Sequence, residues 1–231
     1  MSCSLVTLAL ADARFPGGGH AHSGGVEEAV HRGLVTDPGE LREFLFGRLQ
    51  SAGRLAAVFA AAAAHAADAG GDGRYWRRLD SEIDARTPSP AQREASRAQG
   101  RGTARAGRAA WPSAALDAVL AVSTRPHHPA VIGALMGGAR AGTPREAAAV
   151  AAYLSISGPA SAAVRLLGLD PFAANAAVAA LGPDLERITE DAASVAGHDP
   201  AALPAVGAPA LDLLAQAHHR HHRDEVRLFA S

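Results

Sequence analysis

Three short segments of this chain carry the same signal for the start of an α-helix. They are Asp37-Pro38-Gly39-Glu40, Ser89-Pro90-Ala91-Gln92 and Thr143-Pro144-Arg145-Glu146. In each, the first side chain can accept a hydrogen bond from a free N–H of the first turn, and the proline already has a helical φ. Weaker starts of the same kind stand at Asp170-Pro171, Gly182-Pro183 and Asp199-Pro200. A chain punctuated in this way is expected to be helical along most of its length.

Between these start signals the apolar residues recur every three or four positions, as they do on one face of a helix. Alanine is the commonest residue and aromatic residues make up only 4% of the chain, which favours helix over strand. No stretch of useful length alternates apolar and polar residues as a strand does. We therefore expect an all-α fold, a single-domain bundle of about ten helices spanning residues 1–231.

The expected helices cover residues 4–12, 25–33, 38–68, 73–85, 90–108, 112–123, 129–140, 144–167, 171–180, 183–196 and 208–222. Within 144–167, Gly158-Pro159 is expected to kink the helix, because proline lacks the N–H that an interior turn needs. The segment 197–207 is rich in proline and glycine and is predicted to be a hinge. The loop 13–25 and the tail 223–231 lie outside the regular pattern and are candidate docking segments.

Composition excludes several classes of function. All 22 basic residues are arginine, so the chain has no lysine for a phosphate-binding loop or a Schiff base, and one cysteine cannot form a Cys-pair zinc motif. The net charge of −1 gives no reason to expect nucleic-acid binding. No targeting or membrane-spanning segment is evident, and nothing places Ser23 or Ser157 beside a base. These absences favour a cytoplasmic protein that binds other proteins and is not an enzyme.

The densest segment runs from Arg14 to Glu28 and contains Phe15-Pro16, three successive glycines and the pair His20 and His22. A His-x-His pair can bind a metal in a hydrolase, and glycines before a helix can hold a phosphate. Both readings lack the strands that normally accompany them. A loop of tight turns used for structure or for an interface is favoured over catalysis.

Arginines at positions 93, 97, 101 and 105 follow one another in steps of four, with Arg108 close by. Such steps keep side chains on one helix face, so the sequence predicts a basic ridge. The ridge is either a solvated surface or a contact for an acidic partner, with Arg97 and Arg101 at its centre.

The end of the chain combines a histidine cluster with two apolar residues. His218, His219, His221 and His222 can bind a divalent ion weakly and transiently, or they are polar filler. Leu228 and Phe229 are unusual for a solvated chain end, and they are predicted to anchor a partner or the protein's own core.

Several ordered blocks of this sequence resemble the urease accessory protein UreF family. The opening residues 8–18 and 22–27, the helix at 93–101 and the late helix at 161–169 are similar to family motifs, and so are residues 209–212 and 227–231. The blocks occur in family order over nearly the whole chain. The chain departs from the family pattern at Leu169-Asp170-Pro171, where a glutamine-bearing segment is usual, and in its additional histidines at 218–222.

The resemblance implies an all-helical, usually dimeric adaptor without enzymatic activity. Family members link UreD (also called UreH) to the GTPase UreG, and the assembly uses GTP to deliver nickel to apo-urease. The resemblance implies no stably bound cofactor, because nickel is handled in transit, and a passage through the protein has been proposed for it. The alternative from the residues is a direct nickel or zinc carrier that uses the histidine cluster. The partner contacts we expect are Arg14, Phe15, Pro16, His22, Ser23, Glu27, Arg97, Arg101, Arg227, Leu228 and Phe229.

Overall fold

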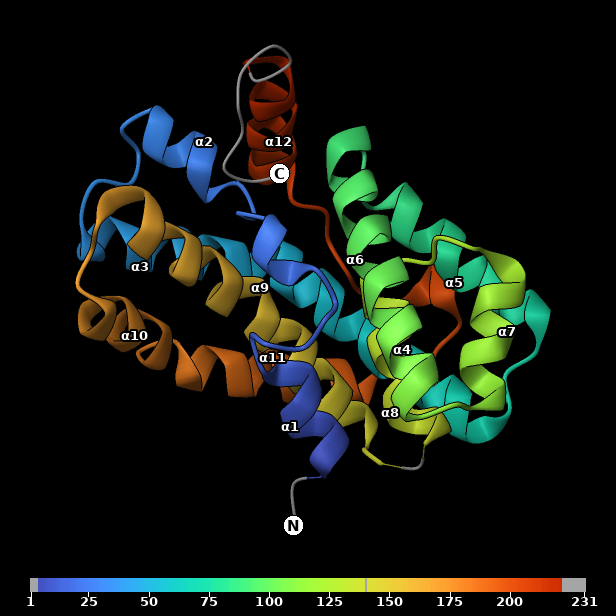
Figure 1. Ribbon diagram of the computed structural model, residues 1–231. Helices are drawn as coiled ribbons and strands as arrows, with labels where there is room; N and C mark the ends of the chain where they lie inside the picture. Colours follow the sequence, from blue (N-terminus) through green and yellow to red (C-terminus); the bar gives the residue numbers. More distant parts are fainter. Residues whose placement is uncertain (1–3, 140, 222–231) are drawn as a thin grey trace.

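The structure is a computed structural model that describes residues 4–139 and 141–221, without the side chains of His20, Arg220 and His221. Its α-helices are α1 (Leu5–Ala11), α2 (Val26–His31), α3 (Pro38–Arg48), α4 (Arg54–Ala69), α5 (Gly73–Ala85), α6 (Pro90–Ala110), α7 (Ala114–Val122), α8 (His128–Gly138), α9 (Pro144–Leu167), α10 (Pro171–Ala179), α11 (Gly182–Ser194) and α12 (Pro209–His221). Short turns of other helix types are η1 (Gly19–Ala21), η2 (Leu49–Gly53) and η3 (Pro200–Ala202). The described residues contain no strand, so the all-α prediction is confirmed (Figure 1).

The three helix-start signals act as predicted. The side chain of Asp37 accepts a hydrogen bond from the backbone N–H of Glu40 at the start of α3, and Ser89 does the same at the start of α6. At the start of α9, Thr143 and Glu146 form a reciprocal capping box. The capping pattern therefore located three of the long helices.

The centre of the bundle is α4, which packs most extensively against α8 and α9 (Figure 1). Its alanines at 57 and 60–64 are almost completely buried. A Cβ added to Gly133 or Gly137 of α8 would lie 2.3 Å from the backbone O of Ala60 or 2.2 Å from that of Ala64. Because the facing residues are small, the backbones of α4 and α8 approach closely. Alanine side chains therefore fill this part of the core in place of larger apolar ones.

The expected single helix 38–68 was wrong in one respect. It is divided into α3 and α4 by η2, a five-residue π-helical segment. A π-helical turn inserts an extra residue into a helix and shifts the faces that follow. Apolar spacing in steps of three and four continues through such a turn, so the sequence pattern did not reveal it.

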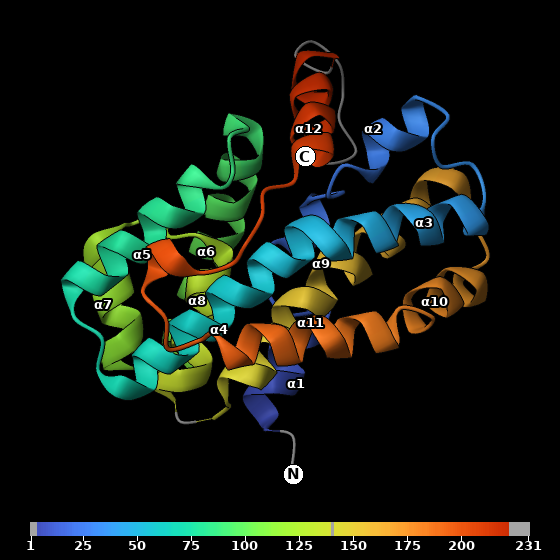
Figure 2. The ribbon, with the colours of Figure 1, turned by 180° about the vertical axis from the view of Figure 1, so that it is seen from behind.

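The segment 197–207 was predicted to be a hinge, and this was wrong because the segment is packed down. Leu203 and Ala205 are buried, and η3 contacts α5. The Arg86 guanidinium donates hydrogen bonds to three backbone oxygens of the segment, those of Ala201, Leu203 and Ala205. Figure 2 shows the segment lying against α5 before the chain turns towards α12.

Among the described residues, α9 is long and apolar enough to cross a membrane by length and composition, and 56% of its most apolar stretch is buried inside the bundle. It runs through Pro159 as one continuous helix. Its contacts with α4, α8 and α11 are those of a central core helix.

Candidate functional site

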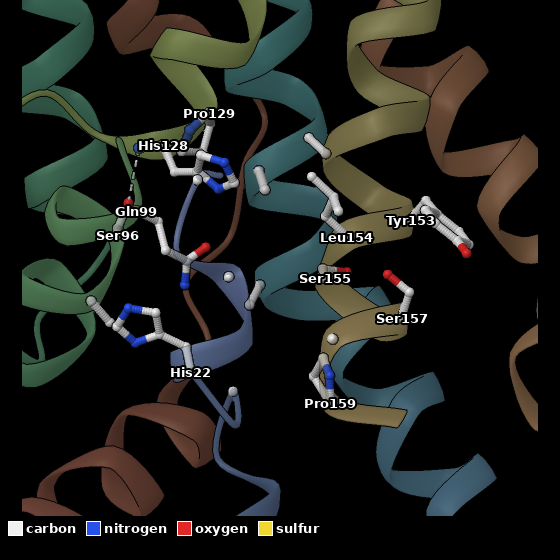
Figure 3. Close-up of a pocket in the computed structure, with 18 of the residues that line it drawn as sticks. His22, Ser96, Gln99, His128, Pro129, Tyr153, Leu154, Ser155, Ser157 and Pro159 are labelled. Atoms are coloured by element: carbon white, nitrogen blue, oxygen red, sulfur yellow. Dashed lines mark hydrogen bonds between the residues drawn. The ribbon is translucent and has the colours of Figure 1, made fainter. Parts of the chain in front are cut away.

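A hollow of about 540 Å³ lies between the N-terminal loop, α6, α9 and α12. The residues that line it include Phe15, His22, Ser96, Gln99, His128, Ser155, Pro159 and Asp212. In Figure 3, His22, Gln99 and His128 face the hollow from one side, and Leu154, Ser155 and Pro159 of α9 lie across from them. The hollow therefore unites segments that are far apart in the sequence, including most blocks of the family resemblance.

The loop 13–25 is held against α6 by two kinds of contact. A Cβ added to Gly102 would lie 2.7 Å from the backbone O of Gly17, so helix and loop touch backbone to backbone. Directly after the end of α6, the ring of Phe15 stacks on that of Trp111, with centroids 6.3 Å apart and planes 11° apart. These contacts fix the loop as one wall of the hollow.

Arg48 joins the same loop to α9. Its Nε donates to the backbone O of Ser155 at 2.6 Å, and its Nη1 donates to the backbone O of Gly24 at 2.6 Å. Pro159 has no N–H, so the oxygen of Ser155, four residues earlier, would otherwise lack its helical hydrogen bond. Burial lowers the pKa of the Arg48 guanidinium to about 10, and it remains charged at neutral pH. Arg48 was not among the residues predicted from the sequence, although the proline inside α9 indicated that an outside donor was needed.

A line of partly buried hydrogen bonds joins α5, α6 and the start of α8 beside the hollow. His127 Nδ1 lies 3.0 Å from Ser96 Oγ, and its Nε2 lies 2.9 Å from Asp84 Oδ1. Burial opposes ionisation of Asp84, but hydrogen bonds from His127 and Arg97 hold the pKa of its carboxyl below the usual value. His127 is fully buried, and Ser96 Oγ also accepts from the backbone N–H of His128, the bond drawn in Figure 3. This serine–histidine–aspartate line is therefore built as a structural link between helices.

The predicted basic ridge of α6 is wrong for Arg97. Its Nη2 pairs with Asp80 at 2.9 Å and with Asp84 at 2.7 Å, and its side chain is only 18% exposed. Arg101 and Arg105 are exposed, and neither forms an ion pair within the described part of the chain. The spacing of four correctly predicted a shared face of α6. Carboxylates of α5, however, pair with Arg97 and hold its side chain against the protein. Arg101 is left as the candidate contact on this face.

The predicted contacts of the N-terminal loop do not share one environment. Arg14 is 90% exposed and pairs with Asp12, and Pro16 is also exposed. His22 faces the hollow (Figure 3), whereas Ser23 is completely buried. Arg14 and Pro16 are thus accessible to a partner, and Ser23 is part of the packing beneath them.

The histidine cluster of α12 is not the exposed group that the sequence suggested. His218 is buried, and its Nε2 lies 3.7 Å from Oε2 of Glu27 on α2. The next residue, His219, is exposed. The side chain of His221 and all of His222, Arg227, Leu228 and Phe229 lie outside the described residues, so the roles expected of them stay predictions.

Among the described side chains, no group of three or more histidine, cysteine, aspartate or glutamate residues is placed to hold a metal ion. The nearest approach to a metal-binding arrangement in the hollow is the pair His22 and His128, since His22 contributes to the lowered pKa of His128. Burial, with a smaller contribution from His22, lowers the pKa of His128 to about 4, so its ring is neutral at pH 7. Neutral imidazole is the form that binds metals. The pair can contact a passing metal ion but supplies only two ligands.

Comparisons with known proteins identify the family of this chain. The sequence profile of the UreF family matches residues 35–182. The chain is 46% identical over its full length to the urease accessory protein UreF of Mycobacterium sp. (strain JLS), and 43% identical over its full length to that of Mycobacterium marinum, each relative also being covered completely. It is 39% identical to the Mycobacterium tuberculosis protein of the same name, across 94% of this chain and 95% of the relative. The chain therefore belongs to the UreF family.

Proposed function

We propose that this protein is a non-catalytic adaptor in urease maturation, which links UreD (UreH) to the GTPase UreG during GTP-dependent nickel insertion into apo-urease. Membership of a family of urease accessory proteins supports the role in maturation. A cytoplasmic location and a homodimeric state belong to the same proposal. The chain would act by holding its partners in a fixed relative position, and the GTPase would supply the chemical step, the hydrolysis of GTP.

The observation that carries the adaptor proposal is the gathering of the family's sequence blocks around one hollow. The loop 13–25, the polar face of α6 and the start of α12 all line it, although they are separated by most of the chain. Exposed groups at its rim, Arg14 and Pro16, lie beside this wall and provide polar and apolar contacts. Proteins that dock partners commonly place such segments together on a rigid scaffold.

Nickel would meet this protein as cargo in transit. The hollow offers ring nitrogens at His22 and His128 and amide and hydroxyl oxygens at Gln99 and Ser96. A site with only two histidine ligands binds a borderline divalent ion but releases it readily, which suits passage better than storage. Tight retention would require further ligands from a partner.

The docking proposal is tested by co-purification of the full chain with UreD. We expect Leu228→Ala combined with Phe229→Ala to reduce the recovered UreD at least several-fold, and deletion of 223–231 to abolish it. Phe172→Ala is the matched control, because this ring is 84% exposed on α10, away from the hollow. Helical circular dichroism should be unchanged in all variants. Equal UreD recovery in wild type and the tail variants would remove the tail from the interface.

The alternative function, a direct nickel or zinc carrier, is tested by equilibrium dialysis. The variant is His219→Ala with His221→Ala and His222→Ala, and His218 is retained because it packs against α2. Tight metal binding that the triple variant loses would favour the carrier. Weak binding that is the same in both proteins, with normal urease activation, would favour the adaptor.

A further inference from the structure

Arg48 carries a positive charge that the described part of the chain leaves without a negative partner. Among residues 4–139 and 141–221, no carboxylate lies within salt-bridge distance of its guanidinium. Within the described residues its hydrogen bonds go to two neutral backbone oxygens, those of Ser155 and Gly24. A buried charge is costly unless a charge of opposite sign or several hydrogen bonds compensate it. Arg48 is compensated only in part.

The geometry leaves one edge of the guanidinium available to the hollow. Arginine has five N–H groups, and the bonds from Nε and Nη1 use two of them. Nη2 donates to no acceptor in the described residues, and Arg48 is one of the side chains that line the hollow. Gly24 gives the guanidinium its place, because a Cβ at that position would lie 2.9 Å from Arg48 Cζ. The charge is thus fixed in position with a free pair of donors.

The other charged residues around the hollow do not supply the missing carboxylate. Asp12 pairs with Arg14 at the protein surface. Asp212 accepts a hydrogen bond from the backbone N–H of Ser89, and burial raises the pKa of its carboxyl, which favours the neutral form. Arg86 lines the hollow as well, but its charge is compensated by an ion pair with Glu82. An anion that enters the hollow can therefore meet the uncompensated charge of Arg48.

We propose that the hollow is a binding site for a carboxylate or a similarly planar oxyanion, held by the free edge of Arg48. The planar fork of a guanidinium matches two oxygens of such a group and binds it more specifically than a point charge would. A volume of about 540 Å³ admits either a small free anion or a carboxylate side chain inserted by a partner. The site uses a different group of the same hollow from the nickel contacts above, and it does not rest on the adaptor function.

The test observes Arg48 directly in the wild-type chain. The Nε–Hε resonance of Arg48 is followed by ¹⁵N NMR while formate or acetate replaces chloride at constant ionic strength. For a free anion we expect a saturable shift, with a rise in Tm over the same concentrations. Arg48→Lys keeps the charge but loses the fork, so its apparent Kd for formate should be weaker by about tenfold or more. Arg42→Lys, an exposed position on the same helix, should bind as wild type does.

A second arm distinguishes the source of the carboxylate and does not require a variant that folds. If small anions leave the resonance unchanged but complex formation with UreD shifts it, the carboxylate comes from the partner, and the site is supported. If neither small anions nor UreD shifts the Arg48 resonance, the proposal is overturned. Formate binding that Arg48→Lys retains at full strength would also overturn it, since the anion would then lie elsewhere.

Discussion

Gly102 offers a sharp test of how the N-terminal loop is held, because it is the point where α6 touches the loop. Replacing it with alanine adds a Cβ that would lie 2.7 Å from the backbone O of Gly17 and 3.0 Å from its carbonyl carbon. Real Cβ atoms are not found this close to a backbone oxygen, so either the loop or the helix must move. Gly102→Ala is therefore expected to push the loop away from α6.

Two effects of opposite sign set the size of the change in stability. Alanine is better than glycine inside a helix by about 1 kcal/mol. The new contact with rigid backbone is a case of overpacking, which typically costs about 1–3 kcal/mol. Gly47→Ala on α3 isolates the first effect, because a Cβ there meets nothing within 4 Å. The free energy of unfolding of Gly102→Ala should therefore be lower than that of Gly47→Ala by about 1–3 kcal/mol.

Thermal unfolding followed by circular dichroism measures this difference. For a chain of this size 1 kcal/mol corresponds to roughly 2–4 °C in Tm. We expect Gly47→Ala to unfold above wild type, and Gly102→Ala to unfold at or below wild type and to recover less UreD in co-purification. If Gly102→Ala raised Tm as much as Gly47→Ala does, the loop would not be held on α6 as described.

Further predictions concern the core and the hollow. Gly137→Ala should have a free energy of unfolding about 1–3 kcal/mol lower than that of Gly47→Ala in urea titrations, since its Cβ would lie 2.2 Å from the backbone O of Ala64; a midpoint equal to that of Gly47→Ala would contradict the close packing of α4 on α8. His128 has a folded-state pKa of about 4, below its usual 6.5, so the unfolded chain binds the proton first as pH falls. The free energy of unfolding should then decrease as the pH falls from 6.5 towards 4, by up to about 1.4 kcal/mol per pH unit. In His128→Gln the same decrease should be less steep. Equal slopes in urea unfolding at several pH values would refute this assignment.

The fold could be predicted largely from local signals. Asp37, Ser89 and Thr143 cap the helices that they were expected to cap, because capping depends on residues only three positions apart. The π-helical turn at Leu49–Gly53 could not be predicted, because it depends on how the helix meets α9. The packing of 197–207 depends on Arg86, more than a hundred residues away in the chain, and a proline-rich sequence carries no sign of that contact.

The site could be predicted only in part, for a similar reason. The loop containing His22 was identified as important from its composition and its family resemblance, and it lines the hollow. Arg97 was misassigned because the carboxylates that bury it come from another helix. Arg48 was missed because its role depends on two distant backbone oxygens, and backbone groups leave no pattern of residue types. A helix cap lies at a fixed distance in the sequence from the group it binds. Residues that meet only in the folded chain have no such fixed spacing.

The adaptor proposal is tested most directly by co-expressing this chain with UreD, UreG and apo-urease and resolving the products by size-exclusion chromatography. The account predicts that the chain elutes with UreD, that UreG joins this complex only when the chain is present, and that omitting the chain prevents nickel-dependent activation of urease. Elution of the chain alone in every combination, with full activation in its absence, would contradict the account.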